Sequence, residues 1–173
     1  MIKTLNIEFE QAIRLLSNNA PVSDENTRKP VLFHDIRVGV YLYENNYSRD
    51  IILAGLLHDA IEFMNIKENT IKTEFGENIL KLVLANSKDE SLEKTQRNED
   101  LIKRCIMSGQ DALIIKTADT IDSFKYYFST GNEEQLQHYC LEIANLIFKF
   151  IPTSFNDCIF EELKLWQNKY LVS

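Results

Sequence analysis

The chain has 173 residues, of which 45% are apolar and 26% charged, and its formal net charge is −7. This size and composition predict a single globular domain over residues 1–173, and no apolar run approaches the roughly 20 residues that cross a bilayer, so no membrane association is expected. Lysine and arginine are dispersed among acidic residues, which argues against long nucleic acid as a ligand but leaves room for a small phosphorylated molecule in a local pocket. The N-terminus lacks the features of a secretory signal, so we expect a cytoplasmic protein; no oligomeric state is predicted.

Only five glycines and three prolines occur, and apolar residues recur at three- and four-residue spacing over long segments. This pattern predicts an all-α fold of about nine helices, several of which end at a glycine. The expected helices cover residues 5–16, 31–45, 49–64, a short segment ending at Phe75, 77–86, 92–107, 111–131, 133–150 and 154–170.

The three cysteines, Cys105, Cys140 and Cys158, are far apart and odd in number. Each lies within an apolar helical pattern. They are interpreted as reduced, buried thiols and not as a disulfide framework.

His58 and Asp59 interrupt the most apolar of the expected helices, between LAGLL and AIEF. A buried carboxylate costs several kcal/mol unless it is hydrogen-bonded, paired or bound to a metal. A lone His-Asp pair is more often structural, because a buried imidazole can donate to a neighbouring carboxylate. The pair alone therefore does not define a site.

Two further residues favour a metal site. His34 interrupts the apolar pattern of VLFHDIRVGVYL, and Asp119 that of ALIIKTADTIDSF. Together with the His58-Asp59 pair they supply two nitrogen and two oxygen donors from three expected helices, and a helical bundle can bring such donors together around one ion.

In this order and spacing, the pattern H…HD…D resembles the HD superfamily of metal-dependent phosphohydrolases. The segments HDAIE at 58–62, 71–89 and 114–124 are most similar to the hydrolase domain of the alarmone hydrolases, which remove pyrophosphate from guanosine tetraphosphate. The resemblance covers residues 28 to about 128 and implies a five-helix HD core there, with the helices of residues 132–170 packed on it.

Carried over to this chain, the resemblance implies that His34, His58, Asp59 and Asp119 bind one divalent metal ion. It also implies that Glu62 acts on the attacking water. Mixed nitrogen and oxygen donors suit Mn²⁺, Fe²⁺ or Zn²⁺ better than Mg²⁺, and the resemblance favours Mn²⁺.

The chain departs from the alarmone-hydrolase pattern at two positions. Phe63 replaces an acidic residue, and Ser123 replaces an asparagine, although Asp122 supplies a carboxylate one turn after the last expected ligand. An Arg-Lys pair precedes the first histidine, with a shorter intervening segment than in that family. The candidate substrate-binding residues are Arg28, Lys29, Lys88, Lys116, Asp122 and Ser123.

The expected function is hydrolysis of a phosphate or pyrophosphate bond in a small nucleotide, with guanosine 3′,5′-bispyrophosphate as the favoured substrate. One alternative is an HD-type nucleotidase or cyclic-nucleotide phosphodiesterase. Another is a non-catalytic HD module that binds a nucleotide or metal in regulation. The loss of an acidic residue at Phe63 favours the regulatory module, whereas retention of all four expected ligands and Glu62 opposes it.

Overall fold

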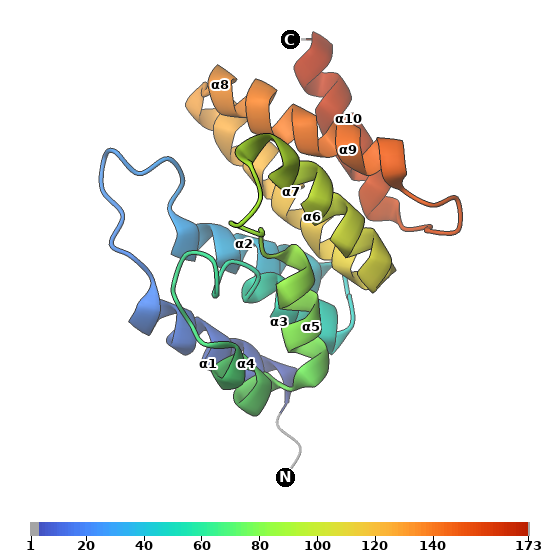
Figure 1. Cartoon of the computed structure of the whole chain (residues 1–173). Coiled ribbons are helices and arrows are strands. Elements are labelled where there is room, and N and C mark those ends of the chain that lie inside the picture. The colour runs from blue at the N-terminus through green and yellow to red at the C-terminus, as the bar shows by residue number, and fades with distance from the viewer. Residues whose placement is uncertain (1–3, 173) are drawn as a thin grey trace. The chain divides into compact units, whose positions relative to one another are not determined.

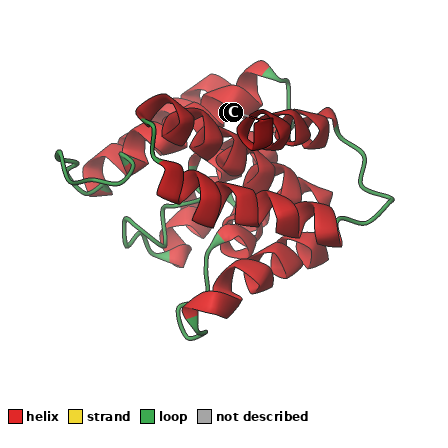
Figure 2. Cartoon of the chain, turned by 90° about the horizontal axis from the view of Figure 1, so that it is seen from above, coloured by secondary structure: helices red, strands yellow, loops and turns green. Residues whose placement is uncertain are grey.

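The computed structural model describes residues 4–172, which form helices joined by loops and contain no strand (Figures 1 and 2). The predicted all-α fold is therefore confirmed. The chain divides into two compact units, Met1–Ser87 and Lys88–Ser173. That the two units form one domain stays a prediction. Across the described part of the chain, no helix has the length and apolar character that crossing a membrane requires.

The first unit is built on α3, against which three other helices pack. Its helices are α1 (Leu5–Asn19), α2 (Val31–Glu44), α3 (Arg49–Leu56), α4 (Glu68–Phe75) and α5 (Glu77–Asn86). Ser48 caps α3: its side chain accepts a hydrogen bond from the Ile51 amide (3.4 Å). Every residue from Ile51 to Leu57 is buried, so α3 is the core of this unit.

Two glycines allow α2 and α3 to pack closely. A Cβ atom at Gly55 of α3 would overlap the Leu42 side chain of α2. A Cβ atom at Gly39 of α2 would lie 3.0 Å from the Leu56 side chain of α3. Any larger residue at these positions would push the two helices apart or distort their side chains.

The second unit is built on α7, whose residues from Ala112 to Phe124 are all buried. Its elements are α6 (Lys94–Ser108), α7 (Gln110–Thr130), α8 (Glu133–Gln135), η1 (Leu136–Leu141), α9 (Glu142–Phe150) and α10 (Cys158–Val172). Gly131 ends α7 in the left-handed conformation (φ 65°, ψ 28°), which costs glycine nothing sterically.

Residues 133–150 form one continuous helical run, as predicted, but its middle part, η1, is a π-helix. Counting α8, η1 and α9 as one run, residues 4–172 contain nine helical runs. A π-helical turn is rare and is often found at functional sites.

Two predictions for the C-terminal part were wrong. The last helix begins at Cys158 and not at residue 154, because the Asp157 side chain accepts the Ile159 amide (3.0 Å) and caps the helix there. Cys158 is consequently exposed, whereas Cys105 and Cys140 are buried thiols as predicted. Burial raises the pKa of Cys105 to about 12.

Candidate metal centre

His34 and Asp35 lie side by side near the start of α2. The His34 amide donates to the carbonyl of Pro30 (3.0 Å), the residue that precedes the helix. Both side chains are fully buried. An imidazole and a carboxylate in the core need polar partners or an ion, since burial otherwise removes the hydration that stabilises them.

His58 and Asp59 lie in a turn, so the prediction that the third helix continues to residue 64 was wrong. α3 ends at Leu56, and residues 57–64 form turns. At the end of α3, Nδ1 of His58 lies 2.7 Å from the Gly55 carbonyl oxygen. The imidazole therefore occupies an acceptor that a backbone amide would use if the helix continued.

The Gly55 carbonyl also sets the tautomer of His58. A carbonyl oxygen can only accept, so Nδ1 carries the proton and Nε2 of the neutral ring keeps its lone pair. Metal-binding histidines are commonly oriented in this way, with the other ring nitrogen donating to a carbonyl or carboxylate. His58 is thus oriented to bind a metal through Nε2.

The two His-Asp pairs come together within the first unit. One donor atom from each of His34, Asp35, His58 and Asp59 lies within 4.8 Å of all the others. The rings of His34 and His58 are 5.1 Å apart and inclined by 77°. Two imidazoles and two carboxylates form a donor set of the kind that holds a divalent transition-metal ion, and three of the four side chains are buried. The residues present therefore fit such an ion.

Glu62 is half-buried in the turn that follows Asp59. The Phe63 amide donates to the Asp59 carbonyl (2.9 Å), which closes a single helical turn containing Glu62. Because α3 has already ended, Glu62 does not share a face of that helix with His58. The role of Glu62 in acting on water stays a prediction.

Asp119, the other predicted ligand, is buried on α7 of the second unit. Lys116 Nζ donates to Asp119 Oδ2 (2.6 Å), and the Tyr139 and Ser123 hydroxyls make longer contacts of 3.4 Å with the same carboxylate. Burial acts to lower the pKa of Lys116, but the charges of Asp119 and Tyr139 and the hydrogen bond to Asp119 outweigh it, and the pKa lies well above its ordinary value.

The remaining candidate substrate-binding residues have different environments. Arg28 is exposed and Lys29 is buried in the loop before α2, and Asp122 is buried on α7. Lys88 is half-buried, with Nζ 5.6 Å from the centre of the Tyr139 ring. Their roles in substrate binding stay predictions.

Two residues of these clusters were missed by sequence reasoning. Asp35 had a usable signal, because it forms a second His-Asp dipeptide with His34 in an apolar helical segment. Tyr139 had none, since its approach to Lys116 (3.3 Å) comes from η1, and nothing in the local sequence marks a π-helix.

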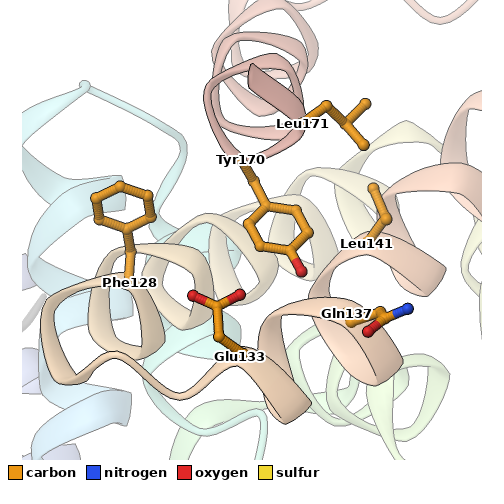
Figure 3. A pocket seen from close by; sticks show the side chains of 6 residues that line it. All are labelled: Phe128, Glu133, Gln137, Leu141, Tyr170 and Leu171. Atoms are coloured by element: carbon orange, nitrogen blue, oxygen red, sulfur yellow. The ribbon is translucent and has the colours of Figure 1, made fainter. Parts of the chain in front are cut away.

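A separate cavity of about 600 Å³ lies in the second unit (Figure 3). It is lined by Phe128, Glu133, Gln137, Leu141, Tyr170 and Leu171. None of these is a predicted site residue. Burial raises the pKa of Tyr170. The negative charge of Glu133 and a hydrogen bond with this residue raise it further.

Comparison with known proteins gives a match to the HD domain family model over residues 12–148. Two curated relatives are guanosine-3′,5′-bis(diphosphate) 3′-pyrophosphohydrolases. The Aquifex aeolicus protein is 30% identical over 76 residues, which are 44% of this chain and 11% of the relative. The Borreliella burgdorferi protein is 36% identical over 55 residues, which are 32% of this chain and 8% of the relative. The chain thus matches only about a tenth of the length of these proteins.

Two solved structures share the fold. A metazoan SpoT ortholog that hydrolyses ppGpp superimposes with a TM-score of 0.77 at 18% identity. The superposition covers 98% of this chain and 98% of that one. A Listeria monocytogenes protein gives a TM-score of 0.67 at 20% identity, covering 81% of this chain and 99% of that one. At these identities, the likeness concerns the fold alone.

Proposed function

The chain belongs to the HD domain family, and on that premise we propose that it is a metal-dependent phosphohydrolase acting on a small phosphorylated nucleotide in the cytoplasm. The observation that carries the proposal is the convergence of His34, His58 and Asp59 within the first unit. The matched relatives support it, since they are pyrophosphohydrolases of a guanosine nucleotide.

The proposed centre binds one divalent ion, with Mn²⁺ as the favoured metal. His34, His58 and Asp59 are the proposed ligands from the first unit. The resemblance in sequence adds Asp119 as the fourth ligand. Such an ion supplies a nucleophile from water near neutral pH and offsets negative charge on the phosphoryl oxygens.

The protein's own groups then orient the reaction. The carbonyl of Gly55 holds His58 with Nε2 available for the ion. Glu62, in the turn after Asp59, takes the proton of the attacking water or positions that water. Lys116 and Lys88 carry positive charge near the Tyr139 ring and suit phosphate oxygens, because an ammonium group donates to them as a point charge.

We propose guanosine 3′,5′-bispyrophosphate as the substrate, cleaved to guanosine diphosphate and pyrophosphate. A nucleoside monophosphate or a cyclic nucleotide is the second candidate. It is favoured by Phe63 and Ser123, where the chain lacks two polar groups of the alarmone-hydrolase pattern. A non-catalytic regulatory module is the third reading, favoured by Phe63 alone.

The test is a phosphate- and pyrophosphate-release assay over these nucleotides with Mn²⁺ added. The wild type should release pyrophosphate from guanosine tetraphosphate. Glu62→Gln should keep the metal and the fold but lower kcat by about 10²-fold or more, since the amide cannot take a proton. Glu68→Gln, an exposed glutamate in the first turn of α4, is the matched control and should act as the wild type does.

Each of the other outcomes would favour one of the alternative functions or remove a proposed residue role. Cleavage of a nucleoside monophosphate or cyclic nucleotide without pyrophosphate release would select the second candidate. A metal-loaded protein that hydrolyses none of the nucleotides would select the regulatory module. Equal rates for Glu62→Gln and the wild type would remove Glu62 from the mechanism.

A further inference from the structure

The first unit contains two His-Asp dipeptides, and the family pattern assigns a role to only three of their four residues. His34-Asp35 lies near the start of α2, and His58-Asp59 follows α3. The fourth residue, Asp35, has no exposed surface, yet it belongs to the same group of converging donors. A carboxylate placed this deeply beside two metal-binding imidazoles requires an explanation, because burial disfavours its charged form.

The position of Asp35 is defined by the two edges of the His58 ring. Asp59 Oδ1 lies 3.4 Å from Nε2, the nitrogen that keeps its lone pair. Asp35 Oδ1 lies 3.8 Å from Nδ1, the nitrogen that donates to the Gly55 carbonyl. An ion bound through Nε2 would lie on the Asp59 side of the ring, whereas the contact of Asp35 is with Nδ1.

We propose that Asp35 is a positioning residue of the metal centre that acts on the ion through His58. Its negative charge beside the Nδ1–H group stabilises positive charge on the imidazole and makes Nε2 a stronger donor. It also brings a second carboxylate charge close to the divalent ion. Carboxylates that support a metal-binding histidine in this way typically contribute 10- to 100-fold to metal affinity. This inference rests on the proposed metal centre.

The same geometry predicts a cost in the protein without metal. Asp35 and Asp59 offer carboxylate oxygens within 4.8 Å of each other, and like charges at such a distance repel, most strongly when buried. Removing the charge of Asp35 should therefore stabilise the metal-free protein while weakening the metal complex. A residue with a purely structural role would not give these opposite signs, because its loss destabilises both forms.

The test compares Asp35→Asn with the wild type by Mn²⁺ titration calorimetry and by thermal melting in EDTA. The variant should bind one Mn²⁺ with a dissociation constant raised by about 10- to 100-fold. Its melting temperature in EDTA should be higher than that of the wild type. Asp50→Asn is the matched control, because Asp50 lies in the first turn of α3, outside the cluster, and it should leave the affinity unchanged.

The outcomes separate this inference from the function it rests on. If the wild type binds no Mn²⁺, Co²⁺ or Zn²⁺, the proposed metal centre itself fails. If the wild type binds metal and Asp35→Asn binds it equally well, only the role of Asp35 fails. A lower melting temperature of the variant in EDTA would also overturn that role. Should Asp35→Asn fail to fold, Asp35→Ser is measured in its place, and failure of both to fold would show a structural role.

Spectroscopy of the Co²⁺-loaded protein tests whether Asp35 acts from outside the coordination sphere. The visible absorption of bound Co²⁺ reports the number and arrangement of its ligands. Asp35→Asn should keep the shape of the wild-type spectrum, because no ligand is lost. A spectrum of changed coordination number would make Asp35 a direct ligand and would overturn the proposed action through His58.

Discussion

The two units each bury a polar cluster, and the clusters differ in how their charges are balanced. In the second unit, the Asp119 carboxylate is 2.6 Å from the Lys116 ammonium and contacts the Tyr139 hydroxyl. In the first unit, the converging donor atoms come from two imidazoles and two carboxylates. One cluster carries its own cation, whereas the other has the composition of a site for an added one.

The comparison indicates where the metal matters for stability. Without metal, a buried ion pair balances its own charge, and removing either partner leaves a costly buried charge. A cluster of metal ligands is completed by the ion, which then stabilises the folded state by mass action. Perturbing the two clusters should therefore give different dependence on metal.

The largest expected effect comes from breaking the pair in the second unit. Lys116→Met keeps most of the side-chain volume but leaves Asp119 buried without its cation, and it should lower the free energy of unfolding by about 3–5 kcal/mol. The chain has a single tryptophan, Trp166 on α10 of the same unit, so urea unfolding followed by its fluorescence in EDTA measures the effect.

Two further variants sharpen this prediction. Lys125→Met is the control, since Lys125 lies on the same helix and pairs with Glu162 at the surface (3.1 Å), where an ion pair contributes about 1 kcal/mol or less. The double variant of Lys116→Met and Asp119→Leu should recover much of the loss, because no buried charge remains. Equal losses for Lys116→Met and Lys125→Met would show that the pair in the second unit is not a buried-charge cluster.

A smaller effect is expected at the helix contact that supports the first cluster. Gly55→Ala places a methyl group against Leu42 and should cost about 1–3 kcal/mol, together with weaker Mn²⁺ binding, because Gly55 also holds His58. Urea unfolding followed by circular dichroism and Mn²⁺ titration measure the two effects. In a Leu42→Ala background the added methyl group should cost little, and an unchanged cost there would contradict the steric explanation.

The last effect concerns pH and appears only in alkaline solution, so it is absent under the conditions of the other tests. Burial raises the pKa of Cys105 from 9.0 to about 12. Between these values the unfolded chain loses the thiol proton while the folded protein keeps it, so stability falls as pH rises. By pH 10.5 the loss should be about 2 kcal/mol.

Urea unfolding at pH 8 and pH 10.5 measures this loss, and Cys105→Ala should show a smaller difference between the two pH values. Cys158→Ala is the control, because Cys158 is exposed. If all three proteins lose the same stability, the thiol of Cys105 does not carry the effect.

The sequence predicts the helices well where periodicity and stop residues agree, as at Gly76 and Gly131, but not where a side chain ends a helix. α3 has an apolar pattern that continues past Leu56, yet the His58 ring binds the Gly55 carbonyl and the helix stops. This contact depends on the three-dimensional position of the imidazole, which apolar spacing does not reveal.

The candidate site, like the helices, was predicted only in part from the sequence. Three of the predicted ligands, His34, His58 and Asp59, were inferred from buried polar residues and a family pattern, and the structure brings their donor atoms together. That they bind a metal stays a prediction. Asp35 was not predicted, although it forms a second His-Asp dipeptide with His34 and joins the same group of donors. Tyr139 could not be predicted, because η1 sets its direction and a π-helix has no distinct residue pattern.

The close packing of α2 on α3 also has a consequence for the proposed metal centre, because it affects which ion that centre would select. His34 is fixed to α2 and His58 to the end of α3, so the gap between their ring nitrogens follows the distance between the two helices. Packed interiors compress little, and here glycines bring the backbones together. In the proposed centre, discrimination by ionic radius would then depend on Gly39 and Gly55 as much as on the ligands themselves, and a widened helix pair would shift preference toward larger ions without changing a donor atom.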